Sequence, residues 1–259
     1  MAELYALVSA GGSPGVTTAA IALALTWPGP VILAECDPSG GDVRAGLLGG
    51  TLPAGPGLME HAIAAGRSES AAASGVPNGL VPLTEAGTRL LLPGLTDPRQ
   101  APGLATSWPA VAATFAAQET DVIADCGRLD AGAGQPLPVL SAARVVALVL
   151  RPTLRQVWAA RSRVGMVTRL TGSARVVLLL TGPGTHSARE VRHALGMPVA
   201  AVLPDDGRTA ALLSDGIGSR RYLRTGALLK SAAAAGRALR EHGEVMTPQP
   251  TGAESRRDA

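Results

Sequence analysis

The feature that most constrains the fold is a strand, a glycine-rich turn, a helix and a second strand at the start of the chain. A short apolar run at 4–9 is followed by the turn Ala-Gly-Gly-Ser-Pro-Gly at 10–15. Thr17 opens an Ala/Leu-rich segment that reads as a helix to about Trp27, and 31–34 is again apolar. Such a βαβ unit requires two parallel strands joined by a right-handed crossover.

The same alternation continues along the rest of the chain. Further strands are expected at 89–92, 121–124, 144–150, 175–180 and 199–203, and further helices at 57–66, 110–117, 154–170, 187–195 and 223–241. We therefore predict an α/β fold, a single doubly wound, mostly parallel sheet with helices on both faces and ligands at the carboxyl ends of its strands. We expect one domain over 1–242 and a disordered polar tail over 243–259.

Composition limits the core and the location of the protein. Hydrophobic residues make up 46% of the 259 residues but aromatic residues only 2%, so Ala, Val and Leu must fill the core. Cys36 and Cys126 have no metal-ligand or disulfide spacing and are expected to be small buried residues. No apolar run reaches the ~18 residues of a membrane span, and we expect a cytoplasmic protein without membrane contact.

The glycine-rich turn admits two ligand-binding interpretations and one without a ligand. A phosphate-binding loop (P-loop), G-x-x-x-x-G-K-[ST], fits if Ala10 takes the first glycine position and Val16 the lysine position. A dinucleotide loop, G-x-G-x-x-G, fits from Ala10 to Gly15, with Glu35 or Asp37 about twenty residues on as the ribose-binding acid. A strand-to-helix turn that binds nothing is the third interpretation.

Residues outside the turn favour the P-loop. A threonine at the start of the helix supplies a hydroxyl for Mg²⁺, which a dinucleotide loop does not need. Asp125 ends a buried apolar strand, where a P-loop protein carries an acid for the waters of the metal. We expect Thr17, Asp37 and Asp125 to converge on one magnesium and water site.

These motifs resemble those of the ParA/MinD ATPases. The segment 8–18 is similar to their deviant Walker A loop, K-G-G-x-G-K-T-T, and 35–41 to their D-x-D-P-x-G segment. The strand at 122–127 resembles their Walker B strand, and 198–205 their late G-x-x-P strand and loop. The resemblance covers most of 1–242 and implies the P-loop fold described above.

The resemblance also implies roles for individual residues. Asp37 would position the attacking water, and Asp125 would anchor the metal through water. Thr17 would bind Mg²⁺ directly. The positions that would contact ATP or ADP are Gly11, Gly12, Ser13, Pro14, Gly15, Val16, Thr17 and Thr18.

Two positions depart from the family. Val16 replaces the P-loop lysine, and Gly11 replaces the signature lysine that reaches across a nucleotide-sandwich dimer. Lys230, far along the chain, is the only lysine. Each charge-assisted hydrogen bond to phosphate contributes about 1.5–3 kcal/mol, so we expect nucleotide affinity to fall roughly ten- to hundred-fold and hydrolysis to fall further. Pro14 also removes an N–H from the loop.

Other charged residues are weaker candidates. Arg44, Arg128 and Arg151 lie near expected strand ends and offer a compensating charge, although each fits a solvated surface role better. Nonspecific DNA contact is considered for Arg220, Arg221 and Arg224, and for the helix arginines Arg155, Arg161, Arg163 and Arg169. A structural role is expected for His61, His186, His193 and His242.

The sequence thus predicts a ParA/MinD-like protein with a degenerate nucleotide site, acting with a protein partner or as a homodimer in positioning, partitioning or assembly. Binding of ATP or ADP with Mg²⁺ is expected to be weak, and ATP hydrolysis weak or absent. Two alternatives stay open: an active ATPase in which an arginine or a partner replaces the lysine, and a nucleotide-free scaffold of a secretion or pilus system.

Overall fold

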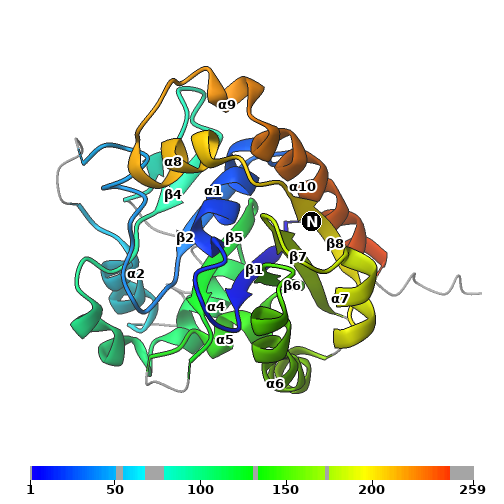
Figure 1. Ribbon diagram of the computed structural model, residues 1–259. Helices are drawn as coiled ribbons and strands as arrows, with labels where there is room; N and C mark the ends of the chain where they lie inside the picture. The colour runs from blue at the N-terminus through cyan, green and yellow to red at the C-terminus, as the bar shows by residue number, and fades with distance from the viewer. Residues whose placement is uncertain (1, 51–54, 68–78, 131–133, 173–174, 246–259) are drawn as a thin grey trace, which may run out of the picture.

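An eight-stranded sheet forms the centre of the molecule (Figure 1). The computed structural model describes residues 2–50, 55–67, 79–130, 134–172 and 175–245. The strand order is β3-β4-β2-β5-β1-β6-β7-β8, and only β3 runs antiparallel to its neighbour in this sheet of described residues. The strands are β1 Leu4–Ser9, β2 Val31–Glu35, β3 Val81–Pro82, β4 Arg89–Leu92, β5 Asp121–Arg128, β6 Val145–Leu150, β7 Val176–Thr181 and β8 Val199–Leu203.

Helices cover both faces of the sheet. The helices are α1 Val16–Thr26, α2 Leu58–Ala65, the 3₁₀ helix η1 Pro98–Leu104, α4 Trp108–Ala116, α5 Leu137–Ala142, α6 Leu154–Thr171, α7 Ala188–Leu195, α8 Gly207–Asp215, α9 Tyr222–Thr225 and α10 Ala227–Val245. One face packs against α1, α8 and α10, and the other against α2, α4, α5, α6 and α7. This is the predicted doubly wound α/β fold.

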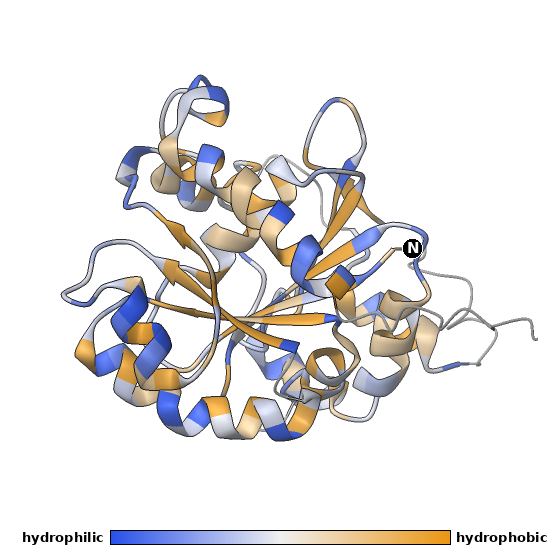
Figure 2. Cartoon of the chain, turned by 90° about the vertical axis from the view of Figure 1, so that its right-hand side faces the viewer, coloured by the Kyte–Doolittle hydropathy of each residue, from blue (hydrophilic) through white to orange (hydrophobic). Residues whose placement is uncertain are grey.

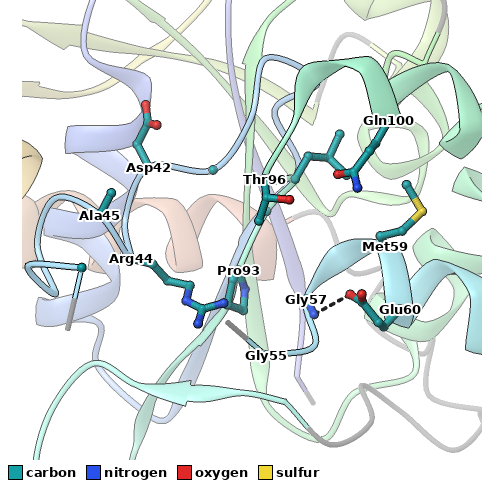
Figure 3. A pocket seen from close by; sticks show the side chains of 14 residues that line it. Asp42, Arg44, Ala45, Gly55, Gly57, Met59, Glu60, Pro93, Thr96 and Gln100 are labelled. Atoms are coloured by element: carbon teal, nitrogen blue, oxygen red, sulfur yellow. Dashed lines mark hydrogen bonds between the residues drawn. The ribbon is translucent and has the colours of Figure 1, made fainter. Parts of the chain in front are cut away.

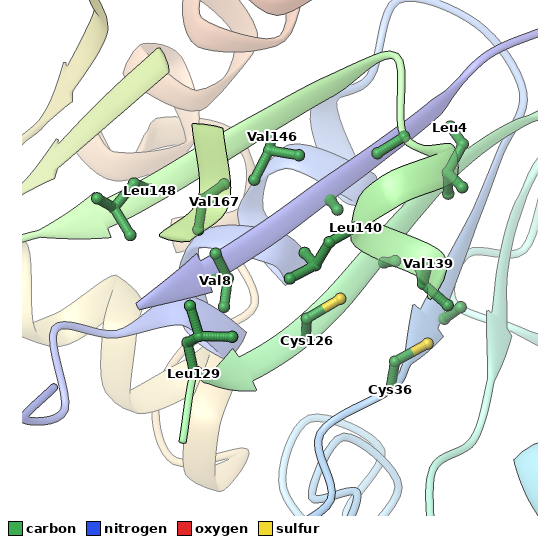
Figure 4. Packing of buried hydrophobic residues seen from close by; sticks show 14 of the residues in the cluster. Leu4, Val8, Cys36, Cys126, Leu129, Val139, Leu140, Val146, Leu148 and Val167 are labelled. Carbon is green, nitrogen blue, oxygen red and sulfur yellow. The ribbon is translucent and has the colours of Figure 1, made fainter. Parts of the chain in front are cut away.

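The core consists mainly of aliphatic side chains, as the composition requires. Every residue of β1, β2, β6 and β7 is buried, because a parallel strand is covered by helices on both sides. Figure 2 shows the apolar strands enclosed by helices whose outer faces are more polar. Cys36 and Cys126 are both free and buried, on the face that α5 covers with Val139 and Leu140 (Figure 4).

Most expected elements are present, with two changes of boundary. The strand expected to end at Asp125 continues to Arg128, because a register shift between Leu7 and Ser9 keeps β1 and β5 paired past that point. The closing helix expected at 223–241 is divided at Gly226, whose backbone leaves the helical region (φ −59°, ψ 135°). Its longer part, α10, continues to Val245, past the expected domain end at 242; residues 246–259 lie outside the described part.

Candidate functional site

The glycine-rich loop follows the central strand β1 and leads into α1, at the carboxyl edge of the sheet (Figure 1). Gly12 and Gly15 have φ angles of 65° and 92°, in the left-handed region that side chains with a Cβ rarely adopt. Gly15 is the N-cap of α1, so a left-handed residue immediately precedes the first helical turn. The two glycines are therefore required by the path of the loop.

The N-terminus of α1 is suited to an anion. No side chain caps it, and its first turn contains no acidic residue. The first N–H groups of a helix have no acceptor within the helix, and the helix dipole makes this end partially positive. A phosphate group placed here would accept hydrogen bonds from these N–H groups.

Two loop residues are held inward, and their side chains offer no donor to a ligand. Pro14 is buried, and its carbonyl accepts a hydrogen bond of 2.7 Å from the Thr181 hydroxyl, which ties the loop to the end of β7. Val16 is 6% exposed and belongs to the core between α1 and the sheet. The position that carries lysine in the motif therefore holds an apolar side chain packed in the core.

The predicted metal-facing residues Thr17 and Asp125 are in contact. The Thr17 hydroxyl donates a hydrogen bond to the Asp125 carboxylate, and Asp125 Oδ1 also accepts one of 3.0 Å from the N–H of Gly127. Asp125 is 2% exposed. Burial raises its pKa to about 7, while the two hydrogen bonds favour the ionised form.

Asp37 lies beside this pair. Its Oδ1 accepts a hydrogen bond of 2.7 Å from the N–H of Ser39, and its charge acts on Asp125. A Cβ atom at Gly127 would collide with the Asp37 carboxylate, and Gly127 has a φ of 60°. The absence of a side chain at 127 is what lets Asp37 approach the carboxyl end of β5.

The three predicted residues thus come together next to the loop. Mg²⁺ needs few protein ligands, because it keeps several waters and takes the rest of its oxygens from phosphate. One hydroxyl and two nearby carboxylates at a helix N-terminus fit that requirement. No group of three or more His, Cys, Asp or Glu side chains suited to a metal occurs in the described residues, so the site does not resemble an all-protein metal cage.

Glu35, the alternative ribose-binding acid, has another role. Its Oε1 accepts a hydrogen bond of 2.9 Å from the N–H of Val43, and its Oε2 one of 3.1 Å from the N–H of Gly94. The side chain is 2% exposed, and burial raises its pKa. Because both oxygens bind backbone, Glu35 joins the segment after β2 to the segment after β4 and cannot reach a ribose.

Three cavities surround the loop and the segment after Asp37. One of about 110 Å³ is lined by Gly15, Thr18 and Arg151, together with Asp205 and Asp206. A second, of about 440 Å³, is lined on one side by Thr17 and Thr18. The third, of about 480 Å³, lies beyond the segment after β2 (Figure 3).

The residues that line these cavities distinguish among the three arginines considered as replacements for the lysine. Arg44 lines the cavity of Figure 3 with Asp42 and Glu60, away from the lining residues of the loop. Arg128 is the exposed last residue of β5. Only Arg151, among these three, lines a cavity together with residues of the loop and α1.

Two neighbours of the loop were missed in the sequence. Gln156 of α6 is 6% exposed, and its Nε2 lies 3.1 Å from where a Cβ of Gly12 would be. Its Oε1 accepts a hydrogen bond of 2.9 Å from the N–H of Arg151. Thr181 is the other residue. Neither belongs to a motif, and only the sheet order, which puts β6 beside β1 and β7 beside β6, brings them near the loop.

Several other candidates are placed on the surface. Arg220, Arg221 and Arg224 are exposed around α9, and Arg221 stacks on Tyr222 at 5.2 Å from the ring centroid. On α6, Leu154 and Trp158 are 69% and 71% exposed, and the guanidinium of Arg161 lies 5.9 Å from the Trp158 ring. We call these two apolar side chains and their flanking arginines Arg155 and Arg161 the α6 patch.

The histidines form no common site. His61 is buried and lies 2.7 Å from the Thr114 hydroxyl, and it stacks on Phe115. Its structural role is that of a core residue. No helix in the described part of the chain is long and apolar enough to cross a membrane.

Comparison with solved structures places this geometry in a known fold. No protein-family model and no curated protein matches the chain. A putative plasmid partition protein from Borrelia burgdorferi bound to AMPPNP has a TM-score of 0.70 at 10% identity, covering 93% of this chain and 99% of its own. The septum site-determining protein MinD from Pyrococcus horikoshii, complexed with Mg-ADP, has a TM-score of 0.65 at 18% identity, and the match covers 96% of this chain and 100% of that one. A chain of the MinC:MinD cell division protein complex from Aquifex aeolicus has a TM-score of 0.66 at 15% identity, and the match covers 93% of this chain and 96% of that one. The chain therefore has the fold of the ParA/MinD P-loop ATPases.

Proposed function

We propose that the chain is a ParA/MinD-like positioning, partitioning or assembly protein that binds Mg²⁺ with ADP or ATP weakly and hydrolyses ATP poorly or not at all. The observation that carries the proposal is the contrast within one loop. Thr17, Asp37 and Asp125 gather beside an uncapped helix N-terminus, whereas position 16 holds a buried valine.

The surviving half of the site accounts for binding. The N–H groups at the start of α1 would hold phosphate, and Thr17 with Asp125 would hold Mg²⁺ and its water. When bound, Mg²⁺ neutralises charge on the phosphates. Asp37, whose carboxylate faces Gly127, is the residue on this chain that would orient a water. Similarity in fold to proteins solved with AMPPNP and with Mg-ADP supports a nucleotide as the ligand.

The missing half accounts for poor hydrolysis. A lysine at position 16 would stabilise the charge that develops on the transferring phosphoryl group, and such preorganised charge is a large part of phosphoryl-transfer catalysis. Val16 provides no charge, and Pro14 provides no N–H. We therefore expect nucleotide binding to act as a signal that changes the state of the protein rather than as a step in fast turnover.

The α6 patch supports a protein partner. Leu154 and Trp158 are four residues apart, so they lie on one face of the helix. The neighbouring face of α6 contacts the loop, since a Cβ at Gly11 would lie 3.8 Å from that of Ala159. The charged residues of α6 are all arginines, so a complementary partner segment would be acidic with an apolar anchor. The MinC:MinD complex is a precedent in this fold for a protein partner.

A homodimer and DNA contact are further parts of the proposal. Gly11 cannot supply the cation that reaches across a nucleotide-sandwich dimer, so a dimer of this chain would be held by other contacts. The exposed arginines around α9 are available for DNA phosphates. We expect the protein to act in the cytoplasm.

Two measurements test the proposed function. Thermal unfolding with and without millimolar ADP or ATP and Mg²⁺ should show a nucleotide-dependent rise in melting temperature. Turnover at saturating ATP should lie well below the typical 1 s⁻¹ lower range of enzymes. No stabilisation by any nucleotide would favour the nucleotide-free scaffold instead. Turnover of 1 s⁻¹ or more would favour the active ATPase with a compensating group.

A further inference from the structure

The cavity beside the loop contains a cation that the P-loop motif does not include. Arg151 directly follows β6, the strand that pairs with β1, and therefore lies at the same sheet edge as the loop. Its backbone is fixed by two hydrogen bonds: its N–H donates to Gln156 Oε1 at 2.9 Å, and its carbonyl accepts from the N–H of Thr153 at 2.8 Å. Arg151 is thus held in a tight turn against the loop.

The Arg151 side chain extends toward the neighbouring strand end. A Cβ at Gly182, the residue after β7, would lie 3.9 Å from the Arg151 Nε and 4.0 Å from its Cζ. The guanidinium therefore lies beside the backbone of Gly182, at the carboxyl end of β7. In this position Arg151 lines the cavity of about 110 Å³ together with Gly15 and Thr18, at the positive end of α1.

The charge of Arg151 is available to a ligand. Among the described residues, no carboxylate lies within 4.0 Å of its guanidinium, and its side chain is exposed. A guanidinium binds phosphate through two parallel hydrogen bonds, so it can replace the charge of a lysine without occupying the same place. The cavity therefore contains a cation, Arg151, that can bind phosphate, and it lies beside a loop in which Val16 occupies the lysine position.

The other charged residues that line the cavity are two acids, which limits the class of ligand. Asp206 accepts hydrogen bonds from the N–H of Thr209 at 3.2 Å, from its hydroxyl at 2.7 Å and from the N–H of Leu228 at 3.3 Å. These contacts hold the pKa of Asp206 below its usual value although burial opposes them, so it stays ionised. Asp205 is exposed. A molecule that fits one cation and two acids has an anionic group and hydrogen-bond donors.

We infer that Arg151 binds the phosphates of a nucleoside di- or triphosphate and is the principal cation of a site in which Val16 provides no charge. The acids of the same cavity accept hydrogen bonds from the hydroxyl or amino groups of the nucleoside. This inference rests on the proposed nucleotide binding and assigns its principal cation. It also distinguishes Arg151 from Arg44 and Arg128, the other two arginines near strand ends.

The experiment compares ADP with adenosine by isothermal titration in the presence of Mg²⁺, using the full chain. Arg151→Ala should weaken ADP binding about tenfold or more and leave adenosine binding unchanged. Arg151→Lys should retain part of the ADP affinity. The controls are Lys230→Ala, which removes the only lysine, and Arg155→Ala, which removes an exposed charge in the first turn of α6; both should bind ADP like the wild type.

The outcomes separate this inference from the proposed function. If the wild type binds ADP and Arg151→Ala binds it equally well, the role of Arg151 is overturned while nucleotide binding stands. A loss of ADP affinity in Lys230→Ala or Arg155→Ala instead would assign the charge elsewhere and also overturn the role of Arg151. If the wild type binds no ADP at all, the proposed function itself is refuted.

Discussion

Restoring the lysine by Val16→Lys changes stability and affinity in opposite directions. Val16 is 6% exposed and packs in the core, so replacing it removes apolar burial, although the lysine methylenes keep part of it. We expect a loss of about 1–2 kcal/mol in the free energy of unfolding, which lowers the melting temperature by roughly 2–8 °C. A new charge-assisted hydrogen bond to phosphate contributes about 1.5–3 kcal/mol, so affinity for ADP should rise roughly ten- to hundred-fold.

The assay for Val16→Lys is isothermal titration with Mg-ADP, together with thermal unfolding of the same protein without nucleotide. Val16→Met is the matched control, because it adds length without charge and should leave ADP affinity close to that of the wild type. If Val16→Lys folds with the expected loss in melting temperature but binds ADP no more tightly than Val16→Met, the missing lysine is not what limits the site. The limit would then lie in the loop backbone around Pro14.

Three further predictions concern the metal, a buried histidine and the surface arginines. Thr17→Ala removes the hydroxyl that contacts Asp125, and it should abolish the dependence of ADP affinity on Mg²⁺; an unchanged dependence in titrations with and without EDTA would contradict the metal role. Burial lowers the pKa of His61 to about 4, so its stabilising effect is present above its unfolded pKa of about 6.5 and is lost as pH falls toward 4. Between pH 7.5 and 5.0 the wild type should lose about 2 kcal/mol relative to His61→Phe in urea unfolding, a change that the exposed-site control His193→Gln should not reproduce. Fluorescence anisotropy with duplex DNA should show weak, salt-dependent binding, and replacing Arg220, Arg221 and Arg224 by alanine should reduce the log–log salt slope by about 2.7. Replacing Arg189 and Arg192, two exposed arginines of α7, should change the slope little. Equal slopes for the wild type and the triple variant would exclude the α9 surface.

Local patterns in the sequence were sufficient for most of the fold. The buried strands are continuous apolar runs, and the turn at 10–15 lies between such a run and an Ala/Leu-rich helix. Since the carboxyl ends of parallel strands share one edge, the pattern predicted that Thr17, Asp37 and Asp125 would lie at the same edge of the sheet. Their approach to one another depends on the strand order, in which β5 lies between β2 and β1, and their role in binding Mg²⁺ stays a prediction. The strands and helices could be predicted because period and spacing directly determine which residues share a face.

Features that depend on contacts between distant segments could not be predicted in the same way. Glu35 resembles a ribose-binding acid until the N–H groups of Val43 and Gly94 are brought to it by the fold. Gly127 reads as an ordinary glycine, and only the structure puts the Asp37 carboxylate where its Cβ would be. The helix α8 was missed because its start, with the cap Asp206 and Thr209, resembles a polar loop.

The arginines illustrate the same limit at the site itself. Arg44, Arg128 and Arg151 all follow or end strands in the sequence, which offers no basis for preferring one. The distinction comes from the sheet order and from the direction of the Arg151 side chain, whose guanidinium lies beside Gly182 in a cavity that Gly15 also lines. Side-chain direction at a strand end is a tertiary property, and a periodic pattern does not contain it.

Titration of the wild-type protein with ATP and Mg²⁺ tests the central claim most directly. A site that keeps Thr17, Asp37 and Asp125 but has Val16 in place of lysine should bind with a dissociation constant of roughly 0.01–0.1 mM, since the lost charge-assisted bond weakens a site of about 1 μM by one to two orders of magnitude. Low-micromolar binding would contradict the claim that the site is weakened. The absence of any binding up to several millimolar would contradict the claim that its metal-facing half still functions.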